Sequence, residues 1–180
     1  FMHGGFLHIF FNMFALFTFG SALENIMGSK RFLNFYLICG LGALALQFFV
    51  QAIELHNITG YITNHGSFEI DYINRTILDT KNIFDQKQLE TIFHTYADPM
   101  VGASGAVFGL LIAFGMLFPN VELLLMFIPI PIKAKYFIPL YVLAELFLGV
   151  RKFEGDSIAH FAHLGGALFG FILIKLWNIH

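Results

Sequence analysis

The chain has 180 residues, of which 57% are hydrophobic and only 12% are charged, and its mean hydropathy is +0.72. This composition excludes an ordinary water-soluble domain and is typical of a helical membrane protein. The formal net charge of −2 gives no basic surplus, which excludes a nucleic-acid footprint. The single cysteine, Cys39, can form no disulfide within the chain and is not a metal site by itself.

Apolar segments, taken in chain order, predict five membrane helices. They cover residues 6–23, 32–53, a run that begins at 101 and ends before Pro119, 136–150 and 158–177. A helix needs about 20 apolar residues to cross a bilayer, so five spans and their loops account for the whole length. The proline-broken apolar stretch at 123–137 is expected to lie along the membrane interface. The predicted fold class is therefore all-α, a polytopic membrane helical bundle that forms one domain over residues 1–180.

A polar stretch from 54 to 98 separates the second predicted helix from the third. It holds three basic and seven acidic residues and is too long for a tight turn. Leu89, Ile92, Phe93 and Tyr96 recur at helical spacing within it, which predicts an amphipathic helix, either on the bilayer surface or in water. Because basic residues mark the cytoplasmic side of the short loops, residues 54–98 are expected to form a long extracytoplasmic loop.

Polar side chains at membrane depth are costly, so each is a functional hypothesis. His8 and Asn12 are four residues apart and share one helix face, where they present two hydrogen-bond donors. Their alternative role is an interhelical hydrogen bond that holds two helices together.

Ser104 stands at the start of the third predicted helix between Gly102 and Gly105. A serine there is most often a helix cap. The flanking glycines, however, allow close approach to a backbone whose amide is unpaired, which suits a nucleophile that helps to hold an oxyanion. Gly105 and Gly109 add a small-residue face for helix packing.

The last helix carries two histidines three residues apart. At helical spacing, His163 heads a stripe of small residues that contains Gly166 and Gly170, whereas His160 lies at the edge of that stripe. If this stripe packs on the Gly105 face, His163 comes within hydrogen-bond reach of Ser104, as a general base must. His160 is expected to line or tune the same pocket.

In this order, the motifs His8-xxx-Asn12, Gly102-Ala-Ser104-Gly and Ala162-His163-xx-Gly166-xxx-Gly170 resemble the rhomboid family of intramembrane serine proteases. The likeness covers nearly the whole chain. It implies a fold of six core helices, of which the first, preceding the histidine-bearing helix, is missing from this sequence. It also implies that Ser104 is the nucleophile and His163 its base.

The same resemblance implies that His8, Asn12 and the Ser104 amide form the oxyanion hole, and that Gly102, Gly105, His160, Gly166 and Gly170 support the active site. The family uses a Ser-His dyad, so no acidic third member is expected beside His163. Neither a metal nor another cofactor is implied. Phe108 occupies a position where an aromatic ring often stacks beneath the base.

The expected protein is a multi-pass membrane endopeptidase that cleaves transmembrane protein substrates within the bilayer. Its expected location is a bacterial plasma membrane. Two other classes stay open. One is a non-catalytic protein of the same fold that binds transmembrane clients. The other is a metal- or proton-handling protein that uses His8, His160 and His163, although no metal-binding motif such as His-Glu-x-x-His is present. The sequence does not fix the oligomeric state.

Overall fold

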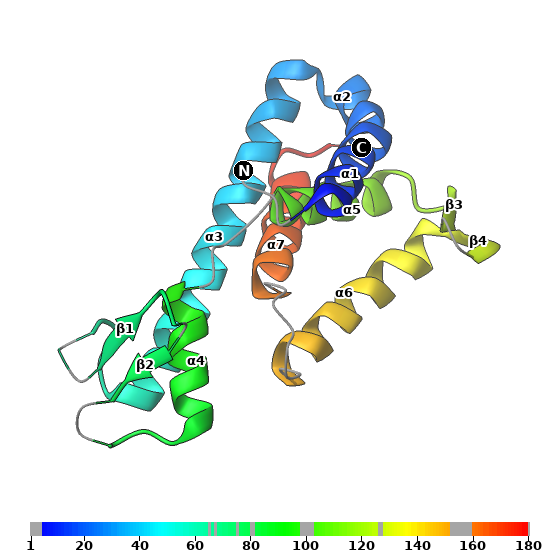
Figure 1. Cartoon of the computed structure of the whole chain (residues 1–180). Coiled ribbons are helices and arrows are strands. Elements are labelled where there is room, and N and C mark those ends of the chain that lie inside the picture. The colour runs from blue at the N-terminus through cyan, green and yellow to red at the C-terminus, as the bar shows by residue number, and fades with distance from the viewer. Residues whose placement is uncertain are drawn as a thin grey trace. The chain divides into compact units, whose positions relative to one another are not determined.

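The computed structural model describes residues 5–64, 66, 68–74, 76–79, 82–97, 103–125, 128–151 and 160–179. It is predominantly helical, as predicted (Figure 1). The chain divides into two compact units, one made of residues 1–47 and 101–180 and the other of residues 48–100. The expectation of a single domain with a long loop at 54–98 stays a prediction.

The first unit begins with one continuous helical rod. It consists of α1 (Phe6–Ala15), the π-helical segment η1 (Leu16–Gly20) and α2 (Ser21–Met27). Gly28 ends the rod in a left-handed conformation, φ 76°, in which its N–H donates to the carbonyl of Glu24 at 2.7 Å. Glycine adopts this conformation without steric cost, so the chain can reverse there into α3 (Ser29–Thr59).

The later part of the first unit carries the remaining apolar helices. These are α5 (Ser104–Leu117), α6 (Ala134–Arg151) and α7 (His160–Leu176). The stretch before α6 forms an antiparallel hairpin of β3 (Glu122–Leu125) and β4 (Ile128–Lys133), a feature that hydropathy alone did not indicate. Helix α5 packs most extensively against α7, and almost every residue from Gly105 to Phe114 is buried.

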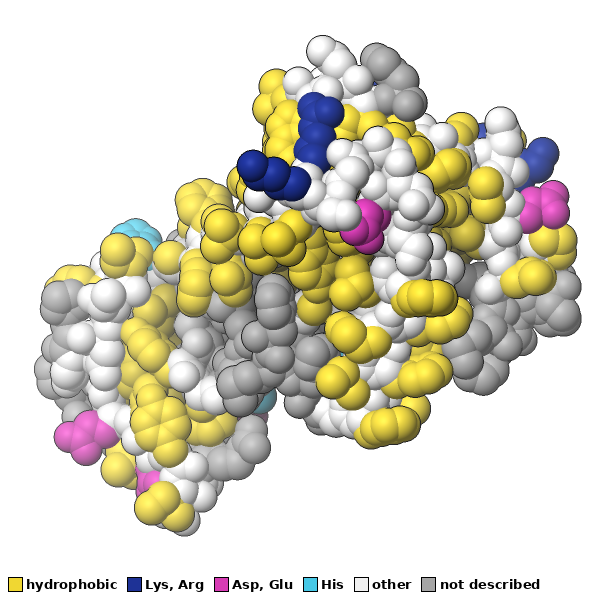
Figure 2. Space-filling model, turned by 90° about the horizontal axis from the view of Figure 1, so that it is seen from above, with side chains coloured by type: hydrophobic (Ala, Val, Ile, Leu, Met, Phe, Trp, Pro, Cys, Tyr) yellow, Lys and Arg dark blue, Asp and Glu magenta, His cyan; other side chains and the backbone are white. Residues whose placement is uncertain are grey.

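The outward surface of these helices is apolar. On the first rod, Phe6 is 80% exposed and Phe17 is 76% exposed, and Figure 2 shows hydrophobic side chains over much of the visible face. Among the described residues, Phe6–Met27 and Ser29–Thr59 are long and apolar enough to cross a membrane, and α5 and α7 are shorter apolar helices. Exposed apolar surface of this extent is expected where lipid is the solvent.

The second unit has a small core of its own. It combines residues 48–59 of α3 with a two-stranded antiparallel sheet, β1 (Glu69–Asp71) and β2 (Thr76–Leu78), and with α4 (Gln86–Ala97). Leu55, Phe68 and Ile92 pack together at its centre. The amphipathic helix predicted around Leu89 is present as α4, whereas the short strands were not predicted.

Candidate active site

Ser104 and His163 meet at the contact between α5 and α7. Ser104 is the first residue of α5, and His163 lies in the first turn of α7. Their Oγ and Nε2 atoms are 2.9 Å apart, although the two residues are separated by 59 positions in the chain. The His163 side chain is only 12% exposed. This is the spacing that a hydroxyl nucleophile and its base require.

Glycines on the two helices make this approach possible. A Cβ on Gly166 would overlap the carbonyl group of Gly105, and one on Gly170 would lie 2.7 Å from the carbonyl oxygen of Gly109. These are backbone atoms, which cannot move aside cheaply. The predicted meeting of the two small-residue faces is therefore found in the structure, and it brings α5 and α7 into backbone contact beside the Ser104–His163 pair.

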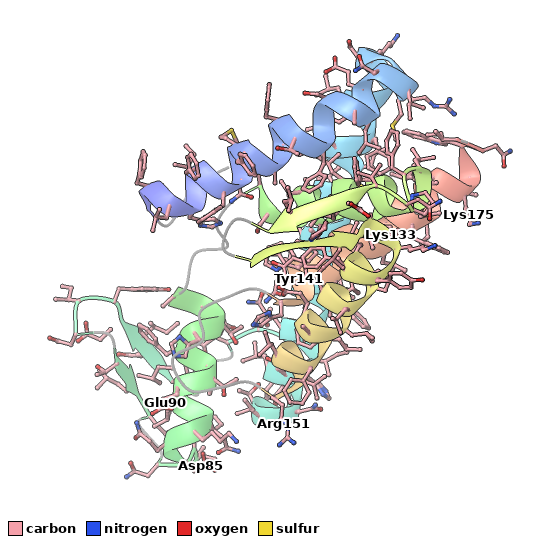
Figure 3. All side chains as sticks on the ribbon, turned by 90° about the vertical axis from the view of Figure 1, so that its right-hand side faces the viewer. Asp85, Glu90, Lys133, Tyr141, Arg151 and Lys175 are labelled. Carbon is pink, nitrogen blue, oxygen red and sulfur yellow. The ribbon has the colours of Figure 1, made fainter. Side chains whose placement is uncertain are left out.

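Phe108 fixes the plane of the His163 imidazole. The two rings are stacked with centroids 4.2 Å apart and planes 8° apart. Phe108 also contacts Tyr141 of α6, with ring centroids 5.1 Å apart; Tyr141 is labelled in Figure 3. Phe108 lies one helical turn after Ser104, so α5 supplies both the hydroxyl and the ring that supports its partner.

A carboxylate also contacts His163, and here the sequence-based expectation was wrong. No acidic residue was expected beside His163, but Oε2 of Glu145 lies 2.9 Å from Nδ1 of His163. Glu145 belongs to α6 and is 5% exposed. The sequence did contain a signal for it, because Glu145 is the one acidic residue in the apolar segment 136–150.

His160 contacts the same carboxylate. Its Nδ1 lies 2.6 Å from Oε2 of Glu145, and the residue is 5% exposed. The two histidines of α7 thus differ in position as helical phase predicted: His163 faces Ser104, and His160 lies beside it against α6. Their shared partner, Glu145, was not foreseen.

The predicted oxyanion donors lie on α1. Asn12 is buried, and its Nδ2 donates to the carbonyl oxygen of His8 at 2.8 Å; His8 itself is half-buried. An asparagine amide carries two hydrogens, so a second can be donated elsewhere. The oxyanion role of His8 and Asn12 stays a prediction. Gly102, predicted to support the site, lies outside the described residues.

Glu145, His160 and His163 also form the one group among the described residues whose ligand atoms could surround a metal ion, all within 4.8 Å of one another. The distances do not favour this use. Two ligands of a tetrahedral zinc ion stand about 3.3 Å apart when each bond is about 2.0–2.1 Å long. The observed separations of 2.6 and 2.9 Å are instead those of hydrogen bonds.

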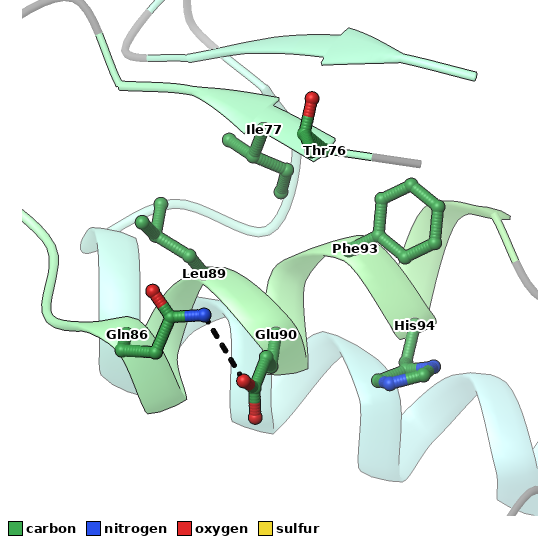
Figure 4. A pocket seen from close by; sticks show the side chains of 7 residues that line it. All are labelled: Thr76, Ile77, Gln86, Leu89, Glu90, Phe93 and His94. Carbon is green, nitrogen blue, oxygen red and sulfur yellow. Dashed lines mark hydrogen bonds between the residues drawn. The ribbon is translucent and has the colours of Figure 1, made fainter. Parts of the chain in front are cut away.

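A separate pocket of about 300 Å³ lies in the second unit, between β2 and α4. Figure 4 shows its lining, which includes Leu89, Phe93 and the hydrogen-bonded pair Gln86 and Glu90. None of the residues that the sequence singled out for chemistry lines it. The candidate active site is therefore the Ser104–His163 contact in the first unit.

Comparison with protein families agrees with this geometry. The model of the rhomboid domain matches residues 1–61 and 83–177. The chain belongs to the rhomboid family. Both helices of the Ser104–His163 contact lie inside the matched ranges, as does Glu145, and the family assignment makes this a membrane-embedded chain.

Curated relatives of the rhomboid chain include one from a bacterium and several named as mitochondrial. It is 30% identical over 174 residues to the "Putative rhomboid protease YdcA" of Bacillus subtilis, which covers 96% of this chain and 61% of the relative. It is 26% identical to "Rhomboid protein 1, mitochondrial" of Saccharomyces cerevisiae, covering 94% of the chain and 38% of the relative.

The "Presenilin-associated rhomboid-like protein, mitochondrial" of Homo sapiens is 27% identical, with 94% of the chain and 34% of the relative covered. The rhomboid chain thus spans less than two thirds of the length of each of these three relatives. No solved structure matches the chain.

Proposed function

We propose that this rhomboid chain is an intramembrane serine endopeptidase that hydrolyses peptide bonds in transmembrane segments of other proteins. The observation that carries the proposal is the 2.9 Å contact between Ser104 Oγ and His163 Nε2. It joins a hydroxyl at a helix start to an imidazole that is stacked on Phe108 and almost enclosed.

In the proposed reaction, Ser104 Oγ attacks the carbonyl carbon of the scissile peptide while its proton passes to His163 Nε2. The C–N bond then breaks, and His163 gives the proton to the departing amine. Water, activated by the same imidazole, attacks the acyl group on Ser104 Oγ and releases the carboxylate product. No cofactor takes part in any of these steps.

The oxyanion of the tetrahedral intermediate requires donors close to Ser104. The backbone amide of Ser104 is one candidate, because the first amides of α5 have no acceptor within their own helix. The side chains of Asn12 and His8 are the proposed further donors. Removing one such donor from a soluble serine protease costs about 10²–10³ in kcat, and a comparable loss is expected here.

The surroundings of the site support this substrate class. The helices around it expose apolar side chains to lipid, so a transmembrane helix is the polypeptide that can reach it from the side. Among such helices, those with small, helix-destabilising residues are the favoured substrates by family resemblance. A bacterial plasma membrane is the proposed location, and relatives named as mitochondrial make an organellar membrane the competing assignment.

The test uses the full chain in lipid vesicles with a panel of fluorogenic transmembrane peptides. Wild type is expected to cleave at least one peptide, whereas Ser104→Ala and His163→Ala are expected to be inactive. A fluorophosphonate probe should label wild type and leave Ser104→Ala unlabelled. Cleavage that persists in Ser104→Ala would refute the proposal. A folded wild type that neither cleaves nor takes the probe would favour the non-catalytic, client-binding alternative.

A further inference from the structure

We propose that Glu145 is a positioning residue that holds His163 in the only form able to accept the proton of Ser104, and that His160 holds Glu145 in place. This inference rests on the proposed protease function. It extends the Ser-His dyad to a hydrogen-bonded group of four side chains drawn from three helices, α5, α6 and α7.

The first step of the argument concerns the two nitrogens of His163. A neutral imidazole carries one hydrogen, on either Nδ1 or Nε2, and only the nitrogen without it can accept a proton. Nε2 is the atom that faces Ser104 Oγ. His163 can therefore act as a base only if its hydrogen is on Nδ1, where Glu145 Oε2 lies at 2.9 Å. An ionised carboxylate can only accept, so it selects this tautomer.

The second step concerns the state of Glu145. A carboxylate that is 5% exposed must be compensated by hydrogen bonds or by charge. Both histidines of α7 bring Nδ1 to the same oxygen, Oε2, at 2.6 and 2.9 Å. Two N–H donors on one oxygen suit an ionised acceptor. His160 thus supplies the second donor, and it does so without touching the reacting hydroxyl.

The backbone is shaped for this arrangement. Gly149 lies one helical turn after Glu145 on α6, and a Cβ on Gly149 would stand 3.1 Å from Cβ of His160. The missing side chain lets the start of α7 come close to α6 next to the carboxylate. Tyr141, one turn before Glu145, packs on Phe108. On α6, Glu145 is therefore flanked by two residues that contact neighbours of the base: Gly149 lies against His160, and Tyr141 lies against Phe108.

During the reaction Glu145 stays ionised and acts through its negative charge. When His163 takes the proton from Ser104 it becomes an imidazolium, and the adjacent carboxylate stabilises that charge in a surrounding of low polarity. The proton stays on Nε2 until the leaving amine takes it. Glu145 should therefore affect the chemical step and not the binding of the substrate helix.

The test compares wild type with Glu145→Gln in vesicles, using a peptide that wild type cleaves. Glu145→Gln removes the charge and keeps the size of the side chain. We expect kcat to fall at least about 10-fold and up to about 10⁴-fold, the loss known when the acid of a soluble triad becomes an amide, with KM changed less than about twofold. Glu122→Gln, the same change at an exposed site on β3, is the matched control and should leave both constants unchanged.

His160→Ala separates the supporting histidine from the base. We expect a loss in kcat smaller than that of Glu145→Gln, because one donor to the carboxylate remains, whereas His163→Ala should be inactive. A His160→Ala protein as inactive as His163→Ala would overturn the division of roles. Unchanged kcat in a folded Glu145→Gln protein would overturn the positioning role itself.

Two further measurements complete the test. If Glu145→Gln fails to fold, Glu145→Asp keeps the charge but withdraws it by one methylene group; a lowered kcat with unchanged KM supports the proposal, and wild-type kcat refutes it.

Loss of wild-type activity on chelation with 1,10-phenanthroline would also refute the proposal, in favour of a metal at this cluster. If Ser104→Ala cleaves as well as wild type, the protease function has failed, whatever Glu145→Gln does.

Discussion

Phe108 and His163 lie face to face, so the base rests on a ring carried by the same helix as its nucleophile. Replacing Phe108 with leucine removes the flat support but keeps an apolar side chain. We expect kcat to fall about 10- to 100-fold, because a small displacement of a catalytic group has effects of that size. Phe108→Tyr retains the ring and should stay close to wild type in a peptide-cleavage assay.

The matched control for this change is Phe114→Leu. Phe114 is buried on the same helix but contacts Phe19 instead of the histidine. Both leucine variants should lose about 1–2 kcal/mol of stability, and only Phe108→Leu should lose kcat. Equal kcat in the two variants would show that the stacking does not orient the base.

Asn12 offers a test of the oxyanion hole. Asn12→Ala should lower kcat about 10²–10³-fold if its amide stabilises the oxyanion. It also removes the bond from Nδ2 to the His8 carbonyl. Ser21→Ala controls for that loss, since the Ser21 hydroxyl makes the same kind of bond to the Phe17 carbonyl on the same rod. If both variants kept wild-type kcat, Asn12 would be a structural residue only.

Two glycine-to-alanine changes should have opposite outcomes, because only one of the two glycines lies at the backbone contact between α5 and α7. In Gly166→Ala the new methyl group overlaps the carbonyl of Gly105, so we expect a loss of about 1–3 kcal/mol and of activity. In Gly40→Ala the methyl group meets Ala106 at 3.6 Å, an ordinary contact, and stability should be unchanged or higher. Thermal unfolding in detergent measures both, and equal stabilities would contradict the contact.

Asp71 gives the β1–β2 turn a dependence on pH. Hydrogen bonds from the backbone and the side chain of Asn74, and then from the backbone of Ile73, hold the pKa of Asp71 below its usual value. A folded-state pKa lower than the unfolded one stabilises the turn above the unfolded pKa, and this stabilisation disappears as the pH falls through the folded pKa. We expect hydrogen exchange at Ile73 and Asn74, corrected for its intrinsic rate, to speed up at acidic pH. In Asp71→Asn the corrected rates should be insensitive to pH, and equal protection of wild type at pH 3 and 7 would contradict the prediction.

Much of the fold could be predicted because hydropathy and helical phase are local properties. The apolar runs located the helices to within a few residues at most ends, and the phase of His163 with Gly166 and Gly170 indicated which face of α7 meets α5. The hairpin β3–β4 was missed because a short apolar run that contains prolines is compatible both with a strand and with a segment at the membrane interface.

Glu145 was missed for a different reason. Its partners are on another helix, and the hydrophobic periodicity of α6 and of α7 does not reveal that these two helices pack together. The resemblance to a family with a Ser-His dyad also predicted no acidic partner for the base. A carboxylate alone in an apolar helix is nevertheless visible in the sequence, and such a residue requires a polar partner.

Helix α5 is buried along most of its length, while α1 and η1 expose most of their phenylalanines on a surface expected to face lipid. Chain segments with these two surroundings should differ in how freely they accept substitutions. A lipid-facing position needs only to stay apolar, whereas most positions on α5 must also keep their volume. The nucleophile is thus placed on a stretch with little room for sequence drift, and activity and stability should be lost together there.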